Sequence, residues 1–121
     1  MSSSGNDFFQ EYRNGLKRLK DVSPKTLEGF NGFYHQAMAD GSLNIKTKEL
    51  IALGIGLAIH CENCIWLHTR AAIKAGASTE EILEAAQVGV VMGGGPAFTY
   101  LPLVQKIIYQ LTQQKILLVN S

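Results

Sequence analysis

The chain has 121 residues, of which 46% are hydrophobic and 17% charged, so we expect one compact domain over residues 1–121. Its net charge of +1 gives no electrostatic reason to expect nucleic acid or an anionic membrane as a partner. The longest apolar run, residues 50–59, is about half the ~20 residues that a membrane helix needs, and residues 1–7 lack the features of a secretory signal. These features predict a soluble, cytoplasmic protein.

Apolar residues recur at spacings of three and four, and no period-two pattern is found, which predicts an all-α fold of about six helices. A first helix is expected over residues 7–20. Five apolar side chains are predicted on its inner face: Phe8, Phe9, Tyr12, Leu16 and Leu19. A second helix is expected to reach about residue 39, with Ser23 as its N-cap and Pro24 in its first turn.

The third predicted helix, over residues 46–59, is almost wholly apolar after Glu49, which favours burial on most of its sides. Gly54 and Gly56 each cost a helix roughly 1 kcal/mol relative to alanine, so their presence suggests close helix packing. A fourth helix is expected over residues 61–75. It would end at Gly76, because glycine readily takes the left-handed conformation found there.

The spacing of Ser78 and Glu81 is that of a capping box and predicts the start of a fifth helix, which continues through about residue 90. The glycines at residues 93–95 and Pro96 then interrupt the pattern. They lack the Gly-Lys-Ser/Thr ending of a phosphate loop. A last helix is expected over residues 97–113, in which Pro102 marks either a kink or the true first turn.

The pattern Cys-x-x-Cys-x-x-x-His is the feature of this chain that points to chemistry. On a helix, Cys61, Cys64 and His68 fall within an arc of roughly 60°, and the two cysteines lie about 5 Å apart between Cα atoms, close enough for a disulfide. A structural zinc site usually needs four ligands, and only His60 or Glu49 is available to complete the set. A redox pair is therefore favoured over a metal site, and no metal or cofactor is expected.

Residue spacing leaves open which thiol attacks the substrate. A cysteine at the start of a helix is favoured as a thiolate by the helix dipole, which points to Cys61. A base one helical turn away points instead to Cys64, because His68 lies four residues further on.

Glu49 has a role in this site only if the chain reverses near His60. In one straight helix Glu49 would lie about 18 Å from Cys61, too far to take part. A helical hairpin would bring its carboxylate against His68, where it would orient the imidazole. No glycine or proline marks such a reversal, so the hairpin is a hypothesis.

Several motifs occur together in one order: Lys48-Glu49-Leu50-Ile51-Ala52-Leu53, the Cys61/Cys64/His68 pattern, Ala71-Ala72-x-x-Ala75-Gly76-Ala77, Glu80-Glu81-Ile82 and Gly93-Gly94-Gly95-Pro96. In these motifs the chain resembles the carboxymuconolactone decarboxylase superfamily, specifically its alkyl hydroperoxidase D-like branch, over a core of about residues 27–104. The resemblance implies an all-α fold assembled as a homo-oligomer, a trimer or hexamer, with active sites close to the subunit contacts.

The resemblance also implies roles for four residues. Cys64 would attack a peroxide after losing its proton through His68 and Glu49, and Cys61 would then close the disulfide. One difference is Asn63, since the best-known hydroperoxidases of this branch have histidine there. Asn63 favours thiol–disulfide exchange over efficient peroxide turnover. The expected function is thus a thiol-dependent oxidoreductase that reduces peroxides or disulfides and is reduced again by a thiol donor.

Two alternatives keep the same fold. In the first, His68 and Glu49 perform acid–base chemistry on a lactone-like acid, as in the decarboxylase branch, which generally lacks the cysteine pair. In the second, the chain is a non-enzymatic assembly module whose thiols are incidental. The apolar run at residues 116–119 supports this module reading because it suggests a subunit contact.

Overall fold

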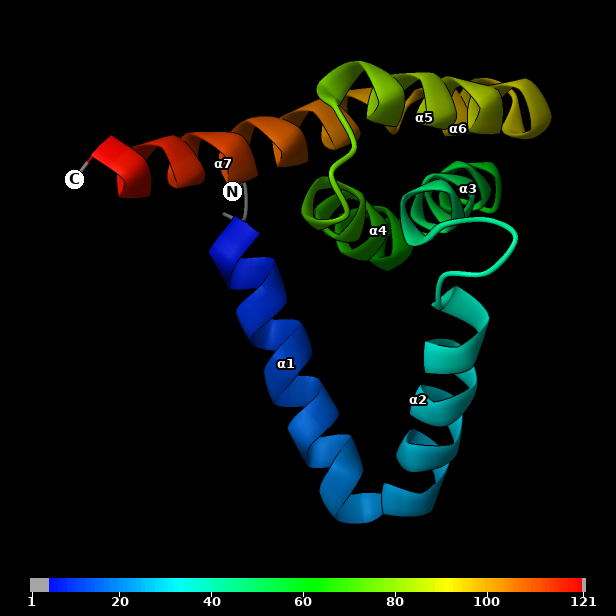
Figure 1. The fold of residues 1–121 in the computed structure, drawn as a ribbon, viewed down its shortest axis with the longest axis vertical. Helices are drawn as coiled ribbons and strands as arrows, with labels where there is room; N and C mark the ends of the chain where they lie inside the picture. Colours follow the sequence, from blue (N-terminus) through cyan, green and yellow to red (C-terminus); the bar gives the residue numbers. More distant parts are fainter. Residues whose placement is uncertain (1–4, 121) are drawn as a thin grey trace. The chain divides into compact units, whose positions relative to one another are not determined.

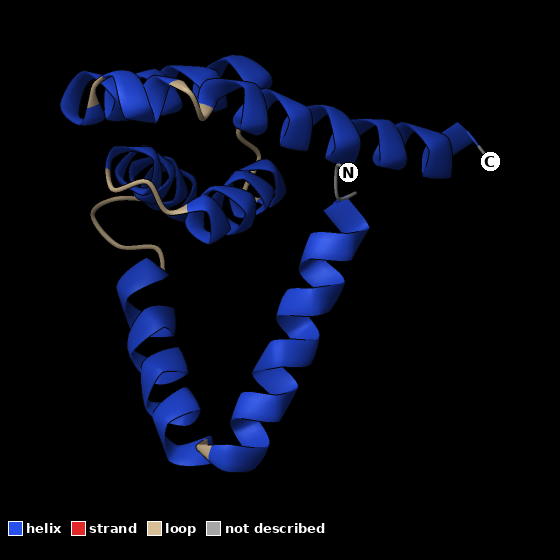
Figure 2. Cartoon of the chain, turned by 180° about the vertical axis from the view of Figure 1, so that it is seen from behind, coloured by secondary structure: helices blue, strands red, loops and turns tan. Residues whose placement is uncertain are grey.

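The computed structural model describes the backbone of residues 5–120 and the side chains of residues 7–113. All regular elements in this part of the chain are helices joined by short loops, which confirms the all-α prediction (Figures 1 and 2). They are α1 (Gly5–Val22), α2 (Pro24–Met38), α3 (Ile45–Ala58), α4 (Glu62–Lys74), α5 (Thr79–Gly93), the four-residue α6 (Gly95–Phe98) and α7 (Leu101–Asn120). None of the helices within the described residues is both long enough and apolar enough to span a membrane.

The contacts of the chain divide it into two compact units, residues 1–40 and residues 41–121, so a single domain stays a prediction. The first unit contains α1 and α2. On α1, Phe9 is buried as predicted, whereas Tyr12 and Leu19 are exposed, so the predicted five-residue inner face is only partly formed. Within α2 no residue is buried. Ser23 does occupy the N-cap, but its side chain makes no capping hydrogen bond.

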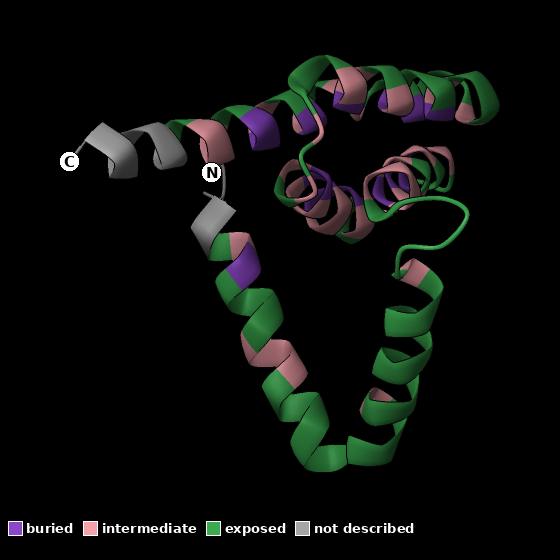
Figure 3. Cartoon of the chain, in the orientation of Figure 1, coloured by how far each residue is buried: buried purple, intermediate pink, exposed green. Residues whose placement is uncertain are grey.

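The second unit is built around α3, which packs against α4 and α5, while α4 and α5 also contact α7. The buried residues lie on the faces that these helices turn toward one another (Figure 3). The fully buried apolar side chains include Leu53, Leu57, Ile65, Ile82, Val104 and Ile107. Ile65 and Trp66 are packing residues as predicted, and Nζ of Lys106 lies 5.7 Å from the centre of the Trp66 ring.

The helices α3 and α5 approach closely because glycines face each other where they cross. An added Cβ at Gly54 would lie 3.1 Å from the carbonyl oxygen of Ala85, and one at Gly89 would lie 3.0 Å from the carbonyl carbon of Gly54. The second distance is well below the about 3.5–4.0 Å at which carbon atoms normally meet, and the first is a tight contact between carbon and oxygen. The prediction that Gly54 marks close packing is confirmed.

The prediction that α3 is buried on most sides is wrong for the single chain. Glu49, Leu53, Gly56 and Leu57 are buried, but Ile51, Ile55 and Ile59 are 47%, 54% and 65% exposed. The reason is that α4 and α5 cover only part of the circumference of α3. The isoleucines on the remaining side of α3 are left 47% exposed or more.

Local sequence signals account for several helix boundaries. Ser78 and Glu81 form the predicted capping box at the start of α5, and Gly76 takes the left-handed conformation after α4, with φ 95°. Pro102 is the second residue of α7, so it marks the true first turn of that helix.

A bond to the Ser78 backbone and the 3.0 Å contact with Lys46 lower the pKa of Glu81.

Candidate active site

The chain reverses between α3 and α4 at His60, which takes a left-handed conformation with φ 60°. Its N–H donates to the carbonyl of Leu57, and the N–H of Cys61 donates to the carbonyl of Gly56, at 3.1 and 2.9 Å. This pair of bonds is a Schellman motif, which satisfies the last carbonyls of α3. The predicted hairpin is therefore present, and histidine is one of the few residues besides glycine that tolerate this conformation.

Cys61 and Cys64 form a disulfide at the start of α4, with their Cα atoms 5.2 Å apart. Cys61 is the N-cap residue of α4, and its Sγ accepts the N–H of Cys64 at 3.2 Å. Both cysteines are half-buried, whereas Glu62 and Asn63 between them are exposed. The pair is thus at the protein surface, beside N–H groups that favour negative charge on sulfur.

Glu49 and His68 meet across the hairpin. Nδ1 of His68 lies 2.7 Å from Oε1 of Glu49, although 19 residues separate them in the sequence. The Glu49 side chain is 6% exposed and that of His68 is 15% exposed. An ionised carboxylate can only accept, so in this contact Nδ1–H of His68 donates to Glu49, and Nε2 is then the ring nitrogen that can take up or release a proton.

The four residues that the sequence singles out therefore lie at the same hairpin. His68 follows Cys64 by four residues within α4, a spacing that places the two side chains on one helix face, about 5–6 Å apart between Cβ atoms. The arrangement can transfer a proton between a thiol and an imidazole that a buried carboxylate orients. It can also exchange two electrons between a dithiol and a disulfide.

The two other histidines, His35 and His60, have no catalytic partner that an observed contact identifies in the part of the chain that the structure describes. His35 is exposed on α2, and the ring of exposed His60 lies 6.3 Å from that of Tyr100. Among the described side chains, no three histidine, cysteine, aspartate or glutamate residues are grouped so as to hold a metal ion.

Gly56 belongs to the site but was singled out in the sequence only for helix packing. It is buried on α3, and an added Cβ would lie 3.2 Å from Cβ of Cys64. A glycine inside an otherwise apolar helix indicates a close neighbour, but the sequence does not say which residue that neighbour is.

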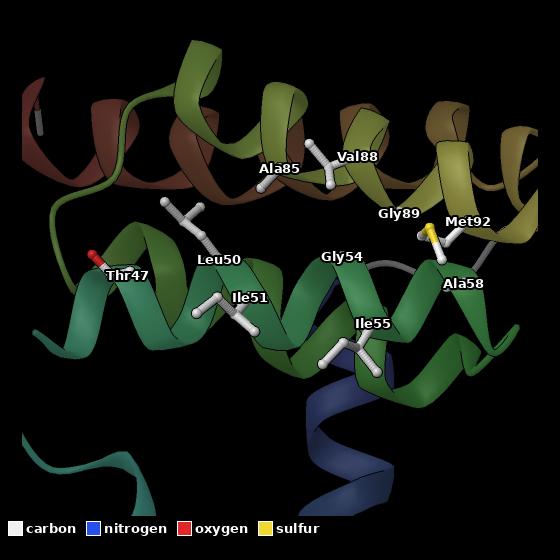
Figure 4. A pocket seen from close by; sticks show the side chains of 10 residues that line it. All are labelled: Thr47, Leu50, Ile51, Gly54, Ile55, Ala58, Ala85, Val88, Gly89 and Met92. Carbon is white, nitrogen blue, oxygen red and sulfur yellow. The ribbon is translucent and has the colours of Figure 1, made fainter. Parts of the chain in front are cut away.

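A separate apolar groove of about 350 Å³ lies between α3 and α5 (Figure 4). It is lined by Thr47, Leu50, Ile51, Gly54, Ile55, Ala58, Ala85, Val88, Gly89 and Met92. None of the four candidate catalytic residues lines it, so the groove is separate from the cysteine site.

Comparisons with known proteins agree with this fold. An uncharacterized protein of Cupriavidus necator is 34% identical over 82 residues, which cover 68% of this chain and 73% of that protein. A crystal structure of a carboxymuconolactone decarboxylase family protein from Legionella pneumophila is similar with a TM-score of 0.79 at 30% identity, covering 90% of this chain and 95% of the other. A family protein from Thermotoga maritima, for which involvement in an antioxidative response has been suggested, has a TM-score of 0.79 at 28% identity, with 88% and 92% covered.

The fold and the site together define a class of small helical proteins in which a cysteine pair opens a helix beside a histidine–carboxylate contact. The family model for carboxymuconolactone decarboxylases matches residues 24–104. The chain belongs to the carboxymuconolactone decarboxylase family.

Proposed function

We propose that this protein is a thiol-dependent oxidoreductase of the alkyl hydroperoxidase D-like type, which reduces peroxides or disulfides through Cys61 and Cys64. The observation that carries the proposal is the 2.7 Å contact between His68 and Glu49, made one helical turn from a cysteine pair that already forms a disulfide. The suggested antioxidative involvement of the Thermotoga maritima relative supports the same reading. In this proposal the protein is an enzyme, and it needs a separate thiol donor.

In the proposed cycle, Nε2 of His68 removes the proton of the Cys64 thiol. The Cys64 thiolate attacks one peroxide oxygen, so the O–O bond breaks, sulfur is oxidised to a sulfenic acid and the peroxide leaves as an alcohol that takes the proton from His68. Cys61 then attacks the sulfenic sulfur, water leaves, and the disulfide forms. With a disulfide substrate, a mixed disulfide replaces the sulfenic acid.

Return to the dithiol requires two thiols from the donor, which are oxidised to a disulfide. The donor thiolate attacks Cys64 and expels Cys61, whose sulfur lies at the N-cap of α4 and accepts the N–H of Cys64. A helix N-terminus stabilises the departing thiolate. A second donor thiolate then attacks the donor sulfur of the mixed disulfide, the Cys64 thiolate leaves, and the donor departs as its disulfide.

The proposed assembly is a homo-oligomer, a trimer or hexamer. It is supported by the apolar groove between α3 and α5 and by the exposed side chains of Ile51, Ile55 and Ile59 on α3. Such a contiguous apolar surface is typical of a protein–protein contact. The side chains of residues 116–119, which the sequence suggests as a further contact, lie outside those described.

Thiol titration with site-directed variants tests the proposed cycle. The reduced protein should lose two thiols on mild treatment with an alkyl hydroperoxide and regain both with a dithiol. Cys61→Ser should accumulate a trappable sulfenic acid at Cys64, whereas Cys64→Ser should not form one at Cys61. A stable adduct at Cys61 in the Cys64→Ser protein would reverse the assignment of the attacking thiol. Decarboxylase activity that survives loss of both cysteines would favour acid–base chemistry instead.

A further inference from the structure

We infer that Gly56 is a positioning residue that sets the thiol–disulfide equilibrium of the Cys61/Cys64 pair. The inference rests on the proposed function, because it concerns the same two sulfur atoms. Gly56 lies on α3, outside the motif that carries the cysteines, yet its carbonyl bonds the N–H of Cys61 and a side chain at its position would crowd Cys64. It therefore links the geometry of the redox pair to the packing of the preceding helix.

The first contact holds Cys61 toward α3. The carbonyl of Gly56 accepts the N–H of Cys61 at 2.9 Å, as part of the turn that reverses the chain. Because Cys61 is also the N-cap of α4, this bond fixes the first sulfur at the junction of the two helices.

The second contact is the close approach of Cys64 to α3 at Gly56. A Cβ on residue 56 would lie 3.2 Å from Cβ of Cys64 and 3.8 Å from its carbonyl carbon. The first distance is a few tenths of an ångström below normal carbon–carbon contact. Cβ of Cys64 is attached directly to the backbone, so no side-chain rotation relieves the overlap. An alanine at position 56 must therefore push the first turn of α4 away from α3.

This push acts on only one member of the pair. Cys61 stays attached to the Gly56 carbonyl while Cys64 moves, so the two sulfurs lose the relative placement that the disulfide requires. In the dithiol the sulfurs are not bonded and can each adjust. We therefore expect Gly56→Ala to favour the dithiol over the disulfide.

Gly54 offers a matched control two residues earlier on the same helix. A Cβ there would be equally crowded, at 3.1 Å from the carbonyl oxygen of Ala85, but that neighbour belongs to α5 and not to the cysteine pair. Gly54→Ala thus crowds α3 to a similar degree without moving α4 directly. A general loss of packing would affect both variants alike.

The experiment equilibrates the full-length protein with mixtures of reduced and oxidised glutathione and counts protein thiols by mass after alkylation. In the reaction, one oxidised glutathione takes two electrons and two protons from the Cys61 and Cys64 thiols, giving the protein disulfide and two reduced glutathiones. Gly56→Ala should lower the equilibrium constant for disulfide formation roughly three- to tenfold, and Gly54→Ala should change it by less than about twofold.

An unchanged constant in Gly56→Ala, or an equal shift in both variants, overturns the inference. The measurement needs no turnover, so a protein that fails to reduce peroxides would contradict the proposed function while leaving this test intact. If Gly56→Ala does not fold, adding Cys64→Gly removes the opposing Cβ and should restore folding, monitored by fluorescence of the single tryptophan, Trp66. Failure of this rescue also overturns the inference.

Discussion

Nδ1 of His68 and Oε1 of Glu49 lie 2.7 Å apart, and both side chains are largely shielded from water. The contact orients the imidazole ring and fixes the nitrogen that carries the proton. In the proposed cycle, this carboxylate would act on the proton-transfer step and not on substrate binding.

Glu49→Gln should therefore slow oxidation of the reduced protein by an alkyl hydroperoxide, at least about tenfold, because a loss of 1.4 kcal/mol in the transition state has that effect. The amide no longer requires Nδ1 to carry the proton, so the base is incorrectly oriented part of the time. Stopped-flow fluorescence of Trp66 would follow the reaction. Glu80→Gln, an exposed acid in the first turn of α5, is the control and should react at the normal rate. Equal rates in the two variants would remove Glu49 from the mechanism.

Gly89→Ala should destabilise the second unit by about 1–3 kcal/mol, because the added Cβ overlaps the backbone of Gly54 where α3 and α5 cross. Urea unfolding monitored by Trp66 fluorescence measures this loss. Gly29→Ala on α2 is the contrasting variant, since an added Cβ there has nothing within 4 Å. It should raise stability by about 0.5–1 kcal/mol through helix propensity, as measured by circular dichroism. A destabilising Gly29→Ala would contradict the open space around that residue.

Glu81→Gln should lower the urea midpoint at neutral pH and have little effect in acid. The folded protein lowers the pKa of Glu81 below its ordinary value of about 4.5, through a bond to the Ser78 backbone and the nearby Lys46. A carboxyl group whose pKa is lowered by folding stabilises the folded protein at pH values above its ordinary pKa. This contribution is lost as the pH falls through the pKa of the folded state. The urea midpoints of the two proteins should thus begin to converge as the pH falls below about 4.5 and should meet once it is below the pKa of Glu81 in the folded protein. A midpoint difference independent of pH would show that the charge of Glu81 is not involved.

Thr69→Val should leave stability unchanged or raise it by about 1 kcal/mol. The Thr69 hydroxyl is fully buried and has no hydrogen-bond partner among the described residues, so replacing it with a methyl group removes an unpaired polar atom. Thr112→Val is the matched control, because that hydroxyl donates to the carbonyl of Ile108 at 2.7 Å. Thermal unfolding of both variants compares them. A larger loss for Thr69→Val than for Thr112→Val would indicate a partner that the hydroxyl needs.

Ile55→Glu should reduce the mass of the particle in solution, measured by light scattering after gel filtration. Ile55 is 54% exposed and lines the groove between α3 and α5, so a charge there opposes the proposed contact between copies. Val91→Glu on α5 is the control, because Val91 is 80% exposed and does not line the groove. A monomeric unmodified protein would contradict the proposed assembly directly.

The helix boundaries were largely predictable because their signals are local. Ser78, Glu81 and Gly76 act through bonds within a few residues, so the sequence contains all that is needed to place them. The cysteine–histidine face of α4 was predictable for the same reason, since it depends only on helical periodicity.

Features that depend on how the helices pack were harder to predict from the sequence. The hairpin depends on His60, which tolerates the left-handed conformation. Histidine, unlike glycine, does not predict that conformation from the sequence. The exposure of Ile51 and Ile55 was predicted incorrectly, because the apolar pattern of a helix does not say how much of its circumference the neighbouring helices cover. The neighbour of Gly56 likewise depends on how the two helices meet.

The left-handed turn at His60 also restricts which residues evolution can place there. β-branched side chains such as valine or isoleucine are strongly disfavoured at positive φ, whereas glycine, asparagine or aspartate fit. A comparison of natural variants should therefore find a narrow choice at this position even in proteins that have lost the cysteines. Conservation at this position would reflect the geometry of the bend. It would not be evidence that His60 is catalytic.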